Sequence, residues 1–279
     1  MRDGAASHKE QIAGVFGRAA PTYDRDGNQR FAYFGRRLVA AAGLAAGARV
    51  LDVAAGRGAV LFAAAEQVGP HGHVVGIDLS GPMVESTAAD IAGRGLTQAA
   101  IHCMDAEHLD FPPASFDHVL CGFGIMFFPD LDHALGEIRR VLRPGGALLA
   151  STWGQRDPRW TISQGIQRDY GVSEGLMVNP LNQPAQVEAA LRRAGFDPVE
   201  VWTDEAEFTY ASEDEWWESL WSTGLRHRLE RLDKETLARF QAEAFQHLRE
   251  RREPSGLPER RQAILAKGVN PAGAITANV

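Results

Sequence analysis

The most constraining feature of this sequence is an apolar run that ends in a turn of small residues, Val50-Leu51-Asp52-Val53-Ala54-Ala55-Gly56-Arg57-Gly58. A strand that feeds a helix through such a turn lets the backbone approach a ligand closely. The free N–H groups at the start of the helix attract an anion, and a carboxylate or a phosphate would satisfy them equally well. The segment therefore predicts a ligand site between a first strand and a first helix.

An acidic residue at the end of the next expected strand narrows the ligand. Asp78 follows Gly58 by about twenty residues, the spacing at which a carboxylate accepts hydrogen bonds from a ribose diol. A dinucleotide fingerprint would need a third glycine, but the turn continues as Gly58-Ala59-Val60-Leu61. That departure counts against NAD without excluding it. The two features together predict a ligand that contains adenosine.

Short apolar runs alternate with helical patterns through the first half of the chain. Strands are expected over 49–53, 73–77, 100–103, 118–121 and 147–151, with helices over 59–68, 81–94 and 131–142. This alternation is typical of a parallel sheet covered by helices, and it predicts an α/β, doubly wound, Rossmann-like fold. Upstream, the first ten residues are expected to be mobile, and helices are expected over 11–20 and 31–44.

The regular alternation of strand and helix patterns ends after Trp153. No strand is expected over 157–178; a helix is expected over 183–194, a β segment over 198–208, a helical region from the capping box at Ser212 to about 252, and a last strand over 262–267. We expect a seven-stranded sheet that is mostly parallel, with the segment from Pro198 parallel and the last strand antiparallel. Insertions at 157–182 and 211–261 then leave the sheet at the edge where ligands bind, and should roof the active site. We expect an N-terminal helical arm (1–45), a cofactor-binding core (46–156) and a remainder with the helical lid insertions (157–279).

Composition excludes several function classes. The chain carries 29 Lys+Arg against 36 Asp+Glu, a net charge of −7 that repels a phosphate backbone, so no nucleic-acid partner is expected. Two cysteines cannot form a disulfide framework, which favours a reducing, cytoplasmic setting. The alanine-rich stretch 38–47 is too short for a membrane anchor. His102, Cys103 and His108 lack the spacing of metal ligands, so no metal is expected.

Several motifs in order carry a family resemblance. They are Asp52 at the end of the first strand, Gly56-Arg57-Gly58, Gly76-Ile77-Asp78-Leu79-Ser80, Asp105-Ala106-Glu107 and the segment from Glu137 to Gly146. This combination resembles class I S-adenosylmethionine-dependent methyltransferases. The segment from Phe16 to Asp24 is similar to the ubiquinone/menaquinone-biosynthesis branch, which methylates small molecules at carbon. The resemblance spans roughly 16–153, and Ala54 departs from it, because the family often has glycine there.

The resemblance implies S-adenosylmethionine as cofactor, S-adenosylhomocysteine as product, and a set of contacts. Asp52 would belong to the cofactor site, the backbone of Ala54, Ala55 and Gly56 would meet the methionine end, Asp78 the ribose, and Leu79 and Met83 the adenine faces. Asp105 and the Ala106 amide would meet the adenine edge, the Cys121 backbone the amino group near the sulfonium, and Tyr23 would close the pocket.

The acceptor side is less defined by the sequence. Trp153, Tyr33 and Phe127 are the expected substrate contacts, and Trp160, Trp216, Trp217 and Trp221 in the two insertions make an aromatic, fairly apolar pocket a plausible expectation. In-line methyl transfer needs alignment in a dry pocket and no covalent enzyme nucleophile. The catalytic residue, if there is one, is unknown. A base could come from Tyr23, Tyr33, His133, Asp169 or Tyr170.

Absent motifs narrow the reaction. After the fourth strand the chain reads Cys121-Gly122-Phe123-Gly124, which differs from the Asn/Asp-Pro-Pro-Tyr/Phe pattern of amino-group methylation, and no aspartate ends that strand to hold a divalent metal. What remains is a metal-independent methyltransferase for a small, hydrophobic or aromatic metabolite, with carbon favoured slightly over oxygen by the resemblance alone. The alternatives are an NAD(P)-dependent oxidoreductase and a non-methylating cyclase or binding protein on the same fold. Monomer and homodimer stay open.

Overall fold

The structure is a computed structural model, and it describes residues 2–25, 28–172, 176–179 and 181–272. Seven strands form one sheet in the order β3-β2-β1-β4-β5-β7-β6. Their bounds are β1 Arg49–Val53, β2 His73–Asp78, β3 Ala99–Cys103, β4 Phe116–Gly122, β5 Leu142–Arg156, β6 Val199–Tyr210 and β7 Leu257–Val269. The first five are parallel, and β7 runs antiparallel to both β5 and β6. The predicted mostly parallel seven-stranded sheet is confirmed.

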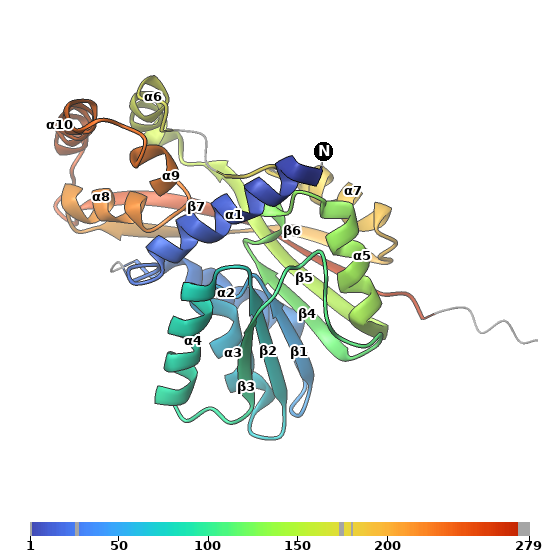
Figure 1. The fold of residues 1–279 in the computed structure, drawn as a ribbon. Helices are drawn as coiled ribbons and strands as arrows, with labels where there is room; N and C mark the ends of the chain where they lie inside the picture. Colours follow the sequence, from blue (N-terminus) through green and yellow to red (C-terminus); the bar gives the residue numbers. More distant parts are fainter. Residues whose placement is uncertain (1, 26–27, 173–175, 180, 273–279) are drawn as a thin grey trace, which may run out of the picture.

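Helices cover both faces of the sheet (Figure 1). The helices α2 (Arg30–Ala42), α3 (Ala59–Val68) and α4 (Gly81–Gly93) share one apolar core with the sheet, and α5 (Leu131–Val141) and α7 (Pro184–Arg193) share the other. The central strands β1 and β4 are enclosed on both sides, which explains why successive residues of each strand, Val50 to Val53 and Val119 to Cys121, are buried. This double cover leaves the carboxyl edge of the parallel strands as the place for a ligand.

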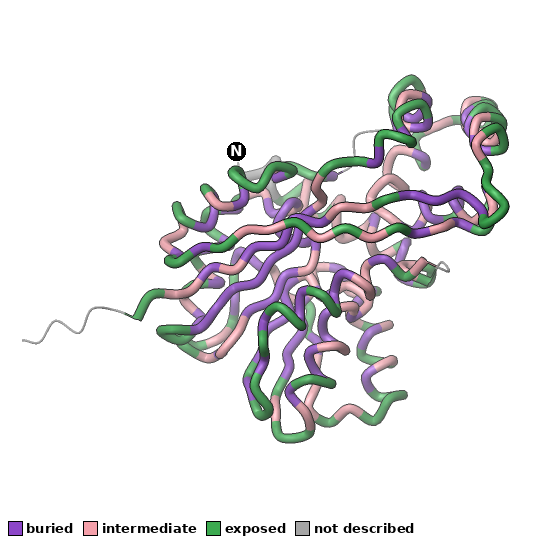
Figure 2. The backbone as a smooth tube through the Cα atoms, turned by 180° about the vertical axis from the view of Figure 1, so that it is seen from behind, coloured by how far each residue is buried: buried purple, intermediate pink, exposed green. Residues whose placement is uncertain are grey.

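The long strands β6 and β7 carry a third apolar core at their far end. It is built by α6 (Thr161–Asp169), α8 (Glu213–Trp221), α9 (Arg226–Leu229) and α10 (Lys234–Glu250), with Trp160 of the short helix η2 (Pro158–Trp160). Figure 1 shows these helices projecting beyond the sheet, and Figure 2 shows buried segments continuing into this end. We call this region, residues 157–172 and 211–261, the lid. Residues 173–175 and 180 of the first expected insertion lie outside the described residues.

The N-terminal arm differs from expectation. Residues expected to be mobile are part of α1 (Arg2–Ala19), which crosses the carboxyl edge of the strands and contacts α4 and α9 (Figure 1). The physical reason is a helical stripe, because Lys9, Ile12, Ala13 and Phe16 recur at a spacing that puts them on one face. Among the described residues, no helix has both the length and the apolar character needed to cross a bilayer. A short 3-10 helix, η1 (Ile125–Phe127), follows β4.

Candidate active site

Two neighbouring cavities open at the carboxyl edge of the sheet. The first has a volume of about 100 Å³ and lies between the ends of β1, β2 and β4, under α1. The second, about 400 Å³, extends from there along β5 and β7 to the lid. Phe16, Tyr23, Phe123 and Phe127 border both cavities. The two spaces therefore meet at an aromatic wall, which we call the shared wall.

The glycine turn shapes one side of the first cavity. Gly56 has φ +51°, and a side chain there would meet nothing within 4 Å, so its backbone faces open space. Ala54 also has a positive φ, +56°, and Phe123 opposite it has +57°. Such strained positions are costly for residues other than glycine and concentrate at functional sites. A Cβ at Gly124 would lie 2.7 Å from that of Ala54, which shows how closely the two turns approach.

Asp78 ends β2 beside this turn. Its carboxylate accepts hydrogen bonds from the backbone N–H of Gly56 at 2.8 Å and of Ser80 at 2.9 Å. Burial raises the pKa of Asp78, and these backbone donors partly oppose the rise. The carboxylate is thus fixed at the cavity wall by two amides, while each oxygen still has a lone pair available for a hydroxyl group.

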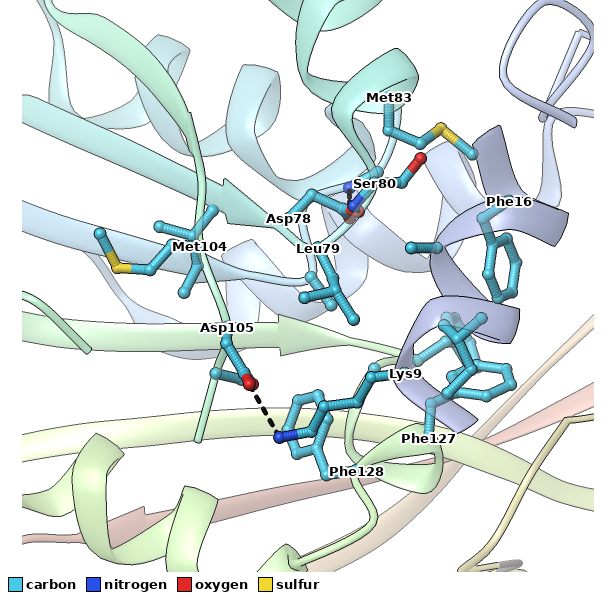
Figure 3. A pocket seen from close by; sticks show the side chains of 18 of the residues that line it. Lys9, Phe16, Asp78, Leu79, Ser80, Met83, Met104, Asp105, Phe127 and Phe128 are labelled. Atoms are coloured by element: carbon cyan, nitrogen blue, oxygen red, sulfur yellow. Dashed lines mark hydrogen bonds and ion pairs between the residues drawn. The ribbon is translucent and has the colours of Figure 1, made fainter. Parts of the chain in front are cut away.

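Asp105 holds an ion pair with the N-terminal helix. Lys9 Nζ lies 2.7 Å from Asp105 Oδ2 and also pairs with Glu107, and Figure 3 shows its side chain reaching across the cavity from α1. Partial burial by itself would raise the pKa of Asp105, but the hydrogen bonds from Lys9 and the Glu107 N–H bring it below the usual value. For Lys9, burial lowers the pKa, and the same partners more than reverse that effect. The ion pair therefore closes the first cavity beneath α1.

The shared wall is a chain of ring contacts. Phe16 meets Phe127 edge to face at 5.3 Å, and Tyr23 stacks on Phe31 at 4.9 Å. Phe123 stacks on Trp153 with ring centroids 4.0 Å apart, and this joins the wall to the second cavity. Burial raises the pKa of Tyr23 far above its usual value, so its hydroxyl is protonated at neutral pH. Tyr23 can donate a hydrogen bond there, but it is not available as a phenolate base.

Most of the predicted residues converge on these cavities. The first is lined by Tyr23, Ala54, Gly56, Asp78, Leu79, Met83, Asp105 and Ala106, and the second by Phe127 and Trp153 together with Tyr23. In the lid, Trp160 and Trp216 border the second cavity. Trp217 belongs to the lid core and Trp221 packs against it, so neither borders a cavity.

Four expected contacts lie behind the cavity surface. Asp52 is fully buried in the sheet opposite Gly76 and Leu120, where burial raises the pKa of its carboxyl well above the usual range. Ala55 and Cys121 are buried too, although their neighbours in the chain line the cavity. Tyr33 packs edge-on against Phe34 and Phe208, because the rotation of α2 turns it away from the cavities.

The expected candidates for a base are mostly remote. His133 is exposed on α5 and packs beside His108, while the Tyr170 hydroxyl donates to Glu243 in the lid. Neither these residues nor Asp169 or Tyr33 borders a cavity, which leaves Tyr23 as the candidate of that set that does. Within the described ranges no group of three or more His, Cys, Asp or Glu side chains could hold a metal ion.

Several lining residues were missed by sequence reasoning. They are Lys9, Ile12 and Ala13 of α1, Glu107, Phe128 and, in the second cavity, Arg156 and Arg261. The helical spacing of Lys9, Ile12, Ala13 and Phe16 was a usable signal for the first group. Nothing local marks Arg156 and Arg261, which meet only through the pairing of β5 with β7.

Comparison with known proteins places the geometry in context. Residues 50–146 match the family described as "Methyltransferase domain". The nocamycin O-methyltransferase of Saccharothrix syringae is 35% identical over 252 residues, which is 84% of this chain and 89% of that protein. The aklanonic acid methyltransferase DauC of Streptomyces sp. strain C5 is 41% identical, over 51% of this chain and 65% of its own length. A demethylmenaquinone methyltransferase of Listeria monocytogenes is 32% identical over 54% of this chain and 66% of its own.

Solved structures share the fold at lower sequence identity. The phosphoethanolamine N-methyltransferase 2 of Haemonchus contortus in complex with S-adenosyl-L-methionine has a TM-score of 0.53 and 21% identity, covering 86% of this chain and 52% of that one. The [4+2]-cyclase SpnF has a TM-score of 0.55 and 22% identity, covering 87% and 82%. At this identity the likeness shows the fold.

Proposed function

Because this chain belongs to the class I S-adenosylmethionine-dependent methyltransferases, we propose that it transfers the methyl group to an oxygen atom of a small hydrophobic or aromatic metabolite. The family, the cofactor and a small-molecule acceptor follow from the relatives, and the acceptor atom and its surroundings are the proposal. Oxygen is supported by the relative matched over 84% of the chain, which is an O-methyltransferase. The sequence motifs favoured the branch that includes the demethylmenaquinone methyltransferases, but the Listeria monocytogenes enzyme matches only about half of this chain.

The observation that carries the proposal is the shared wall. A cavity beside the glycine turn and Asp78 meets a larger one lined by Trp153, Trp160 and Trp216, and Phe16, Tyr23, Phe123 and Phe127 border both. Two ligands placed in these cavities would approach each other where these four rings border both spaces. The rings leave little room for water there. Alignment of donor and acceptor in such a dry space supplies much of the acceleration of a displacement.

The residues of the first cavity fit the cofactor. Asp78 offers a half-buried carboxylate that can accept hydrogen bonds from a ribose, and Gly56 offers backbone facing open space. Leu79, Met83 and Phe128 supply apolar walls for a base. S-adenosylmethionine supplies a methyl group bound to a sulfonium. We assign Tyr23, Ala54, Gly56, Asp78, Leu79, Met83, Asp105 and Ala106 to this ligand, and Trp153 and Phe127 to the acceptor.

This assignment gives each segment of the chain a separate role. We propose that residues 46–156 bind the cofactor, and that the insertions at 157–182 and 211–261 cover the acceptor. The arm at 1–45 closes the first cavity, whose volume of about 100 Å³ is small against the roughly 300–1,000 Å³ of ordinary ligand pockets. We therefore expect Lys9 and α1 to shift outward when the nucleoside enters.

Two measurements test the proposal. Calorimetric titration with S-adenosylmethionine should show saturable binding, and incubation with methyl-¹³C-labelled cofactor and cell metabolites should yield S-adenosylhomocysteine together with a labelled product. The ¹³C chemical shift distinguishes a methyl bound to oxygen from one bound to carbon. A carbon-bound methyl would overturn the assignment of the acceptor atom. Cofactor binding without any transfer, as expected of a cyclase, would overturn the proposed activity.

A further inference from the structure

The second cavity contains more charge than an apolar acceptor needs. Its charged lining residues are Arg30, Arg156, Asp157, Glu259 and Arg261. The Asp157 carboxylate already has partners, because it accepts hydrogen bonds from Arg159 and from the Arg260 N–H. Glu259 accepts the Tyr210 hydroxyl at 3.1 Å and pairs with Arg261 at 2.9 Å. Glu259 is therefore the carboxylate of β7 that remains to balance the guanidinium groups of Arg30, Arg156 and Arg261 at this cavity.

Arg156 and Arg261 stand directly opposite each other. They are partners in the antiparallel pairing of β5 with β7. Like charges at such positions destabilise a sheet, so this arrangement costs free energy unless a negative group lies between them. The pKa of Arg156 is lowered first by its loss of water and then by Arg261, and Glu259 opposes this only in part. Among the described residues Arg156 has no ion-pair partner, and the Nε of Arg261 is buried without a hydrogen bond.

The position of the pair within the cavity matters. The Arg261 guanidinium carbon lies 5.6 Å from the ring centroid of Trp153. Trp153 in turn stacks on Phe123 of the shared wall. Trp153 therefore separates the two arginines from the first cavity. A group bound by Arg156 and Arg261 would sit at the far end of the acceptor from the atom beside the shared wall.

We propose that Arg156 and Arg261 form an anion subsite, and that the acceptor is an aromatic or hydrophobic acid whose carboxylate they hold away from the methylated atom. This inference rests on the proposed function only for assigning the second cavity to the acceptor. A carboxylate between the two guanidinium groups replaces their repulsion with charge-assisted hydrogen bonds, for which the planar arginine fork is suited. The subsite orients the acceptor, and Trp153 packs against its ring system.

The test compares two probes that differ only in charge. 3-Hydroxy-2-naphthoate and its neutral primary amide are titrated into the protein saturated with S-adenosylhomocysteine, and binding is followed by tryptophan fluorescence. We expect the acid to bind about tenfold more tightly than the amide. Arg156→Gln should reduce this preference to less than about threefold, since one of the two cations is lost. Arg260→Gln is the matched control, because Arg260 neighbours the subsite in sequence but lines neither cavity and pairs with Glu205.

Equal affinity of the wild-type protein for acid and amide would overturn the subsite, and so would a preference that survives in Arg156→Gln. The nucleoside titration separates this result from the proposed function. S-adenosylhomocysteine binding without acid preference refutes the subsite alone. If the nucleoside does not bind, the probes are titrated into the protein by itself, and acid preference there refutes the proposed function alone.

Thermal unfolding without ligand gives a second, independent readout. Arg156→Gln removes a like-charge contact, so the unliganded variant should melt at the same or a higher temperature than wild type, while the gain in melting temperature on adding the naphthoate should be lost. A marked fall in melting temperature without ligand would show that Arg156 serves a structural contact, and would overturn the inference. Arg261→Lys, which keeps a cation beside Glu259, should retain stability while weakening the preference for the acid.

Discussion

The two cavities share a wall, but they satisfy their polar groups in opposite ways. In the first, the carboxylates of Asp78 and Asp105 are held by backbone amides and by Lys9. In the second, Arg156 and Arg261 face each other with Glu259 as their near counter-charge. A nucleoside needs hydrogen-bond acceptors for its sugar and base. The same cofactor, S-adenosylmethionine, is used with many different methyl-acceptor substrates. Under the proposed assignment, the first cavity is the cofactor half, built for a ligand that many methyltransferases share, and the second is the acceptor half, where we expect the specificity of this chain to lie.

The largest expected effect tests whether the cofactor half works alone. Asp78→Ala should weaken S-adenosylmethionine binding by about 10- to 100-fold, or about 1.4–3 kcal/mol, because a pair of charge-assisted hydrogen bonds is lost. Calorimetry measures the change directly. Glu66→Ala, at an exposed position of α3, is the control and should bind as wild type does. Unchanged affinity in Asp78→Ala would show that the ribose is held elsewhere, and the assignment of the first cavity would fail.

The next effect should be confined to the acceptor half. Trp153→Phe keeps a ring near Phe123 but reduces the surface that packs against the acceptor and against Arg261. With the acceptor found by the labelling experiment, kcat/KM should fall about tenfold, while cofactor affinity stays within about twofold. Trp217→Phe is the matched control, since Trp217 lies in the lid core and should affect stability rather than kcat/KM. Parallel losses of cofactor and acceptor binding would mean that the two halves do not act separately.

A smaller effect, on the rates of cofactor binding and release, is expected from loosening α1, which covers the first cavity. Lys9→Met removes the ion pairs to Asp105 and Glu107, which hold α1 over the first cavity. Both association and release of S-adenosylhomocysteine should accelerate by about threefold or more, as for a loosened lid, and stopped-flow fluorescence measures both rates. The difference from wild type should persist at high salt, because partly buried ion pairs are screened much less than exposed ones. Lys9→Arg should restore slow release, and equal rates in all three proteins would show that α1 does not control access.

The contrast also explains what the sequence could predict. The sequence could predict that Gly56 and Asp78 line one cavity, because Gly56 lies in the turn after β1 and Asp78 ends β2, where local spacing fixes the geometry. Tyr33 was misplaced because a small error in the rotation of a helix turns a side chain from a cavity to a core, here against Phe208. Lys9 and Asp105 meet across 96 residues, and their contact depends on how α1 crosses the sheet. The facing of Arg156 and Arg261 depends on strand register, which no local motif specifies.

The smallest expected effect concerns the strain beside the cofactor site. Ala54 adopts φ +56°, a conformation that glycine reaches without the clash of a Cβ atom. Ala54→Gly should therefore raise the free energy of unfolding by up to about 1 kcal/mol, since relief of strain outweighs the added freedom of the unfolded chain. Ala55→Gly is the matched control: Ala55 is buried in the same turn without a positive φ, so the change should destabilise the protein. Urea unfolding measures both. If the two variants lost stability equally, the turn would hold no strain at Ala54, and the cofactor half would owe its shape to packing alone.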